Sequence, residues 1–212
     1  MLNAAHYVAN ETLPNGLRLL IRAPEPNDDL AAAVQTQASP QSFFYRFLRP
    51  KHYLTDKELA PLRDCDFINQ VPLIGLVRQN LRMAIVAGAR YWITRVDEGE
   101  IAFMVADAYQ KQGIGTAMLN HLCTIARQAG LKHLYALATP DNEGALRLLK
   151  KLGFPCEVKS DPAQRMLHQF TYPGELFLVD ALGGEGMTDA PVSFCPAKPE
   201  GNKLTQRQRV HQ

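Results

Sequence analysis

A glycine-containing loop between two apolar segments is the part of the sequence best suited to bind a charged ligand. It follows the apolar run 101–105, precedes apolar residues at helical spacing, and reads Gln110-Lys111-Gln112-Gly113-Ile114-Gly115-Thr116-Ala117. We therefore expect a strand, the loop and then a helix. The first N–H groups of a helix lack partners and lie at the positive end of its dipole. Since glycine permits close approach, the amides from Gln112 to Ala117 are predicted to bind a phosphate or pyrophosphate.

The spacing of this loop excludes two common nucleotide-binding motifs. A Walker A loop needs four residues between its glycines and a lysine before Thr116, but only Ile114 separates Gly113 from Gly115. A dinucleotide fingerprint needs a third glycine where Met118 stands, and an acidic residue ending the next strand. An ordinary tight turn into a helix is the alternative for the two glycines taken alone.

Composition limits the class of protein. The chain has 212 residues with 46% hydrophobic content, which is enough for one domain with a sizeable core. A net charge of +2 argues against a nucleic-acid partner. The four cysteines form no Cys-x-x-Cys pair and the six histidines show no ligand spacing, so we expect no metal. No apolar run is long enough to span a membrane, and the N-terminus has no signal-peptide pattern; we expect a cytoplasmic protein.

The elements that must position the loop follow from periodicity and from turn and capping residues. We expect strands at 16–21, 71–77, 83–94, 100–106, 131–138, 154–158 and 166–178, and helices at 30–37, 41–48, 55–63, 114–129 and 142–152. The fold class is α+β, with a central mixed, mostly antiparallel sheet flanked by helices. Residues 1–180 are expected to form one domain, and 181–212, rich in glycine and proline, a flexible tail. The oligomeric state is left open.

Two sequence blocks resemble the GNAT family of N-acetyltransferases. Gln110, Gly113 and Gly115 match the family pattern Arg/Gln-x-x-Gly-x-Gly/Ala. The later segment from Asn142 to Gly153-Phe154 is similar to its Asn-x-x-Ala…Gly-Phe block. The resemblance covers roughly residues 16–178. It implies the GNAT fold, with a strand–glycine loop–helix–strand core that binds acyl-CoA, and an enzyme that transfers an acetyl group from acetyl-CoA.

Looser matches resemble the acetyltransferase domain of bacterial Pat-type protein lysine acetyltransferases. They include Ser42-Phe43-Phe44-Tyr45-Arg46-Phe47 and Gly88-Ala89-Arg90-Tyr91. This closer resemblance implies that the amine acceptor is a protein lysine. A small amine or polyamine is the alternative, and a non-catalytic domain that binds acyl-CoA as a sensor is an alternative of another class. The acceptor site is expected around Phe43 to His52 and the last two strands.

The resemblance also implies which residues contact acetyl-CoA. The pyrophosphate would lie on the loop amides, and the pantetheine would pair with the backbone of the central strand at Phe103, Met104 and Val105. A backbone N–H near Val105 would stabilise the thioester oxygen as it becomes negative. Asn142 is a predicted helix N-cap, and the matching family asparagine also faces the CoA arm.

Glu100 matches the glutamate that Pat-like enzymes use as general base, which implies direct attack of the amine in a ternary complex. By composition alone, a solvated acid in the turn at 97–100, where three acids lie within four residues, is the favoured interpretation of Glu100; the resemblance favours the base. Many family members place a tyrosine general acid where this chain has Leu149, so protonation of the thiolate is unassigned. Tyr135 is expected to be a core or edge aromatic, and Cys123 a packed residue of the motif helix.

Overall fold

The computed structural model describes residues 3–50, 53–154, 156–160 and 166–171. The predicted tail 181–212 and the end of the predicted last strand lie outside the described residues. The boundary expected at residue 180 therefore stays a prediction.

The described strands form one eight-stranded sheet in the order β1-β2-β3-β4-β5-β6-β8-β7. Their bounds are β1 Val8–Thr12, β2 Arg18–Arg22, β3 Gln70–Gln79, β4 Arg82–Arg95, β5 Glu98–Val105, β6 His133–Ala138, β7 Cys156–Ser160 and β8 Met166–Thr171. β5 and β6 pair in parallel, and every other described pair is antiparallel. The predicted mixed, mostly antiparallel sheet is confirmed.

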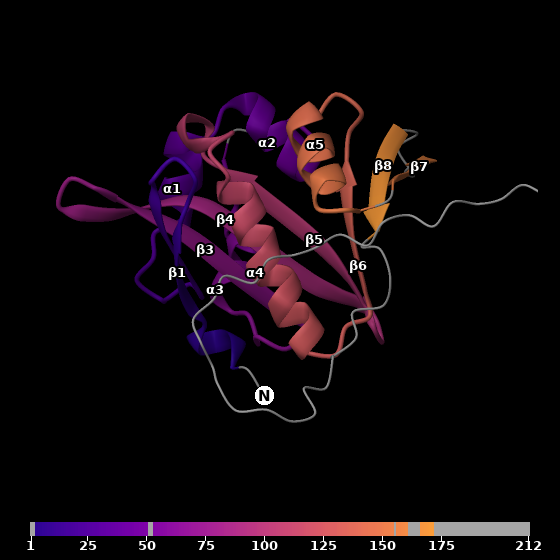
Figure 1. Ribbon diagram of the computed structural model, residues 1–212, viewed down its shortest axis with the longest axis horizontal. Helices are drawn as coiled ribbons and strands as arrows, with labels where there is room; N and C mark the ends of the chain where they lie inside the picture. Colours follow the sequence, from indigo (N-terminus) through magenta and orange to yellow (C-terminus); the bar gives the residue numbers. More distant parts are fainter. Residues whose placement is uncertain (1–2, 51–52, 155, 161–165, 172–212) are drawn as a thin grey trace, which may run out of the picture. The chain divides into compact units, whose positions relative to one another are not determined.

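The helices lie on both faces of this sheet. Their bounds are α1 Leu30–Gln37, α2 Pro40–Phe47, α3 Asp56–Arg63, α4 Ile114–Gln128 and α5 Glu143–Lys151, with short 3-10 turns at Ala4–His6 and Asp107–Tyr109. Figure 1 shows α4 lying across β3, β4 and β5. Side chains cap several helices at the predicted positions: Asn142 accepts from the Ala145 N–H at 3.1 Å, and Glu58 accepts from the Thr55 N–H at 2.9 Å.

Two hydrophobic clusters fix which side chains of the central strands face which helices. On one face, Met118 and Leu122 of α4 pack with Ile101 and other strand residues. On the other, Phe43 of α2 packs in a separate cluster with residues of α1, α3 and β3. Successive side chains of a strand point to opposite faces, so Glu100 lies on the face that α1, α2 and α3 cover.

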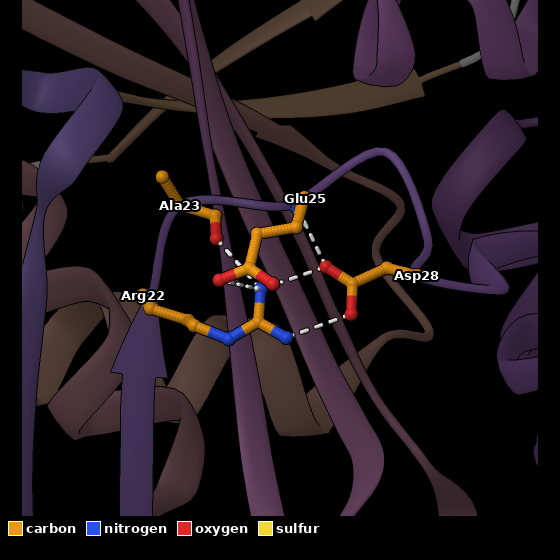
Figure 2. Close-up of polar contacts among 4 residues, drawn as sticks. All are labelled: Arg22, Ala23, Glu25 and Asp28. Carbon is orange, nitrogen blue, oxygen red and sulfur yellow. Dashed lines mark hydrogen bonds and ion pairs between the residues drawn. The ribbon is translucent and has the colours of Figure 1, made fainter.

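A partly buried ion pair fixes the turn that leads from β2 to α1 (Figure 2). The Arg22 guanidinium donates to both Asp28 carboxylate oxygens at 2.7 Å and to the Ala23 carbonyl at 2.9 Å, while the Glu25 N–H donates to Asp28 at 2.6 Å. Two parallel bonds of this kind restrain direction as well as distance. The turn thereby sets where α1 begins on the sheet.

Two strands differ from the sequence expectations. The sequence predicted one N-terminal strand, but β1 precedes it and forms the sheet edge; none of its residues is fully buried, so it lacks a hydrophobic pattern. His121 of α4 holds it in place through hydrogen bonds to the Tyr7 hydroxyl and, at 2.8 Å, to Glu11 of β1. The strand expected at 100–106 begins two residues earlier, at Glu98, so Glu100 is a strand residue as expected and does not lie in the turn that its alternative interpretation required.

Candidate active site

The parallel strands β5 and β6 separate partway along their length, which creates an open backbone edge. Their pairing runs from Glu98–His133 to Ile101–Ala136 and stops, whereas β5 stays paired with β4 as far as Val105. Residues 102–105 therefore have a strand partner on one side only. Their N–H and C=O groups on the other side are available to an extended ligand, as in an additional strand.

A cleft of about 930 Å³ lies along this open edge. Its lining includes Glu100, Phe103, Met104, Val105, Gln110, Lys111, Gly113, Gly115, Thr116 and Asn142. The fold thus brings together β5, the glycine loop and the start of α5. Of the residues predicted as site residues, Gln112, Ile114 and Ala117 do not line the cleft.

The glycine loop presents a helix N-terminus to the cleft. Gly113 caps α4 with φ +92°, a left-handed conformation that glycine adopts without a Cβ penalty. The Ala117 N–H donates to the Gly113 carbonyl at 3.1 Å, so this amide, predicted to bind phosphate, is already used within the helix. The amides of Gly113, Ile114, Gly115 and Thr116 precede the first intrahelical bond and are the ones a ligand can use.

The side chains of two other loop residues, Ile114 and Gln112, stabilise the loop and do not face the cleft. The Ile114 side chain is 1% exposed and belongs to the core, so only its backbone can contact a ligand. The Gln112 side chain donates to the Ala108 carbonyl at 3.0 Å and accepts from Asn15 at 3.2 Å. The core packing of Ile114 and the hydrogen bonds of Gln112 explain why these two side chains do not line the cleft.

Gly115 permits α5 to pack against the start of α4. A Cβ at this position would lie 2.9 Å from Cδ2 of Leu148 and 3.8 Å from Cγ2 of Val105. The absence of a side chain therefore brings the helix N-terminus close to both α5 and the end of β5. This contact sets the width of the cleft between them.

Polar contacts join α2 to the end of β5. The Gln110 side-chain amide donates to the Val105 carbonyl at 3.2 Å and to Asp107 at 3.0 Å. Asp107 also accepts from the Ser42 hydroxyl at 2.6 Å and from the Ser39 N–H at 2.9 Å. Gln110, predicted as a CoA contact, thus has a structural role. It also lines the cleft, where a ligand can reach it.

Glu100 lies between two aromatic residues of the neighbouring strands, Trp92 of β4 and Tyr135 of β6. The Tyr135 hydroxyl donates to its carboxylate at 3.1 Å. Burial raises the pKa of Glu100 above its ordinary value, while the hydrogen bond from Tyr135 and the charges of Arg46 and Arg90 oppose the rise. A half-buried carboxyl with a raised pKa in a cleft is suited to accept a proton.

Arg46 lies within the acceptor region expected from the sequence, whereas Arg90 is a site residue that the sequence interpretation did not identify. Arg90 pairs with Ala102 across β4 and β5, and Arg46 lies in the last turn of α2 and lines the cleft. The signal available in the sequence was a single charge within the apolar strand 84–93. Within the expected acceptor region, Phe43 is 1% exposed and packs in the core, while Lys51 and His52 lie outside the described residues.

Neither Leu149 nor Tyr135 supplies the missing tyrosine acid. Leu149 is fully buried in the core, and Tyr135 does not line the cleft. Cys123 is packed as expected, and burial raises the pKa of its thiol to about 12. Among the described residues, no group of three His, Cys, Asp or Glu side chains is placed to hold a metal ion, and no helix is long and apolar enough to span a membrane.

Comparisons with known proteins agree with this geometry. The acetyltransferase (GNAT) family model matches residues 40–154, more than half of the chain. An acetyltransferase of Pseudomonas aeruginosa is 28% identical over 168 residues, which cover 77% of this chain and 88% of that protein. The GNAT domain of S. lividans PAT has a similar structure, with a TM-score of 0.68 and 25% identity over 78% of this chain and 96% of that one.

A third relative is similar in fold. The acetyltransferase yncA of Salmonella typhimurium, whose structure contains its cofactor acetyl-CoA, has a TM-score of 0.58 and 19% identity over 82% of this chain and 99% of that one. The family match, the sheet order and the cleft at the separated strands lead to one conclusion. This chain belongs to the GNAT family of acetyltransferases and is an acyltransferase.

Proposed function

We propose that this protein transfers the acetyl group of acetyl-CoA to a primary amine, with Glu100 as the general base. The placement of Glu100 carries the proposal, because its carboxyl lines the same cleft as the N-terminus of α4 and its pKa is raised by burial. An alkyl ammonium has a pKa of about 10.4 and arrives protonated. A carboxylate whose pKa lies nearer neutrality removes that proton and leaves the amine nucleophilic.

The cleft suits acetyl-CoA along its whole length. The free amides of Gly113 to Thr116 would bind the pyrophosphate. The open edge of β5 at 103–105 would pair with the pantetheine, and the N–H of Val105 would donate to the thioester oxygen as negative charge develops there. Asn142 already caps α5 with its side-chain oxygen, so its NH₂ group is what it can offer the CoA arm.

Direct attack on the thioester fits the placement of Cys123 better than an acyl-enzyme on this residue does. Cys123 is buried and does not line the cleft, and its raised pKa keeps the thiol protonated. A thiol must ionise to act as a nucleophile. The amine and acetyl-CoA would therefore bind together before transfer.

Two classes of acceptor are candidates. A protein lysine is favoured by the likeness to the GNAT domain of S. lividans PAT and by the Pat-like segments 42–47 and 88–91. A small amine is favoured by a separate cavity of about 400 Å³ under α1, α2 and α3, which adjoins the cleft at Arg46, Ala102 and Met104.

One experiment tests the function. Thiol release from acetyl-CoA is followed across free amino acids, polyamines and lysine-bearing proteins, with acetyl-CoA binding measured by calorimetry in parallel. We expect binding together with thiol release that depends on an amine and yields its amide. Binding without release on any acceptor would favour the non-catalytic sensor. No binding would contradict the assignment of the cleft.

A further inference from the structure

Two arginine side chains beside Glu100 lack an acceptor. Among the described residues, neither Arg46 nor Arg90 donates a hydrogen bond or forms an ion pair, and Nε of Arg90 is buried without a partner. Each guanidinium lies over an aromatic ring instead, at 5.0 Å from the centroid of Phe47 for Arg46 and 4.8 Å from that of Trp92 for Arg90. A partly buried guanidinium with no acceptor is unfavourable, so the site is complete only with an anion bound.

The charges of the site also favour an anion. Two guanidiniums face one carboxylate, Glu100, so the cluster carries an excess positive charge. Burial lowers the pKa of both arginines, and their mutual repulsion lowers that of Arg46 further, to about 10, although Glu100 opposes this. A polyamine would add positive charge here. A bound carboxylate would neutralise the cluster.

The cavity beyond the arginines is mainly apolar. Arg46, Ala102 and Met104 line both the cleft and this cavity, and Arg90 lines the cavity. Its remaining wall includes side chains such as Leu30, Leu54 and Ile85. Glu100, Ala102 and Met104 share one face of β5, so the base, the two guanidiniums and the apolar cavity are neighbours on that face.

We propose that the acceptor is a free α-amino acid with an apolar side chain, an inference that rests on the proposed function. Its ammonium lies against Glu100, its carboxylate accepts from Arg46 and Arg90, and its side chain enters the cavity. A zwitterion meets both requirements at once, because it supplies the missing negative charge and gives Glu100 a cation.

The transfer step balances without a further reactant. Glu100 takes one proton from the ammonium, and the amine nitrogen bonds to the thioester carbonyl carbon. The C–S bond breaks, and the second proton lost by nitrogen ends on the CoA thiolate. The products are the N-acetyl amino acid, CoA and a protonated Glu100, which returns its proton to water.

Matched acceptors test the inference. L-leucine, L-methionine and L-phenylalanine are compared with their amides, which keep the amine and side chain but lose the carboxylate. We expect kcat/KM for at least one acid to exceed that of its amide by about 100-fold or more, a factor typical of a charge-assisted pair. In Arg46→Met and Arg90→Met, this preference should fall at least tenfold, mainly through KM for the acid. Arg95→Met removes a charge from the exposed end of the same strand and should keep the preference.

Binding to the CoA-loaded protein gives a second readout that needs no turnover. By calorimetry with CoA present, the acid should bind tightly and the amide at least tenfold more weakly. Equal rates and equal binding for acid and amide would overturn the inference, as would acetylation of lysine-bearing proteins with no binding of any free amino acid. If lysine-bearing proteins are acetylated and no free amino acid binds, the proposed function stands. Binding of the acids with no thiol release would instead contradict the proposed function.

Discussion

The Tyr135 hydroxyl donates a hydrogen bond of 3.1 Å to the Glu100 carboxylate, between two residues that are neighbours in the parallel pairing of β5 and β6. Tyr135 does not line the cleft, whereas Glu100 does. In the proposed mechanism, Tyr135 is thus a positioning residue that orients Glu100 from outside the cleft. Because a hydrogen bond to the charged form lowers a pKa, it also counteracts the rise that burial causes.

Removing this hydroxyl should change the pH dependence of the reaction. In Tyr135→Phe, the pKa of Glu100 should rise further, so the acidic limb of the kcat/KM profile should move to higher pH by about one unit. Activity on the alkaline side of that limb should stay within about threefold of the wild type, since the base is intact there. A profile identical to the wild type would show that Tyr135 does not act on Glu100.

Glu100 should lower the stability of the folded protein near neutral pH. Its folded pKa is raised above the ordinary 4.5, so the folded state binds more protons than the unfolded state between these two values. Stability contributed by the neutral acid is therefore lost as pH rises from 4.5 through the folded pKa. Glu100→Gln should be at least as stable as the wild type in urea at pH 8. Below about pH 4, which is under the ordinary pKa of glutamate, the free energies of unfolding of the two proteins should converge, since both side chains are then mainly neutral. Lower stability of the variant at pH 8 would contradict this.

The backbone conformation of Gly113 should matter for acetyl-CoA more than for stability. Gly113→Ala places a Cβ on a residue at φ +92° and should cost about 1–2 kcal/mol. Gly130→Ala carries the same strain, since Gly130 has φ +86° and open space around it, but it lies at the other end of α4. We expect similar losses in unfolding free energy, with Kd for acetyl-CoA raised about tenfold or more only in Gly113→Ala. Equal acetyl-CoA affinities in the two variants would show that the loop does not bind acetyl-CoA.

The ion pair between Arg22 and Asp28 should stabilise the turn that leads to α1. Burial favours the neutral form of Asp28, but the hydrogen bonds from Arg22 and the Glu25 N–H, with the Arg22 charge, outweigh it, so the pKa of Asp28 falls below the ordinary 3.8. Its contribution is present above 3.8 and is lost as pH falls through the lower folded pKa. Asp28→Asn should lower the free energy of unfolding by about 2–3 kcal/mol at pH 7. Urea titrations at pH 7 and pH 3 measure this, and an unchanged midpoint at pH 7 would show that the pair contributes nothing.

Local patterns predicted the parts of the fold whose interactions are local. The buried face of α4, including Ile114, Met118, Leu122 and Ile125, follows directly from helical spacing. The caps at Asn142 and Thr55 follow from residue type. The glycine pattern predicted the turn into α4 correctly because Gly113 has a backbone conformation that is nearly specific to glycine.

Contacts between distant segments had no such signal. Tyr135 meets Glu100 only because β5 and β6 pair in one parallel register, which local residue types do not encode. Arg46 and Arg90 converge only once α2 is docked over β4 and β5 by Asp107. The edge strand β1 was missed because it buries no side chain fully and one of its contacts with α4, from Glu11 to His121, is polar.

The most direct test of Glu100 as the base compares two glutamates of the same strand. Glu98 lies two residues before Glu100, does not line the cleft, and has a partly exposed side chain near Arg95. With any acceptor that supports turnover, kcat of Glu100→Gln should fall about 100-fold or more while acetyl-CoA affinity by calorimetry stays within about twofold. Glu98→Gln should retain wild-type kcat. Wild-type kcat in Glu100→Gln at saturating acetyl-CoA and acceptor would contradict the account.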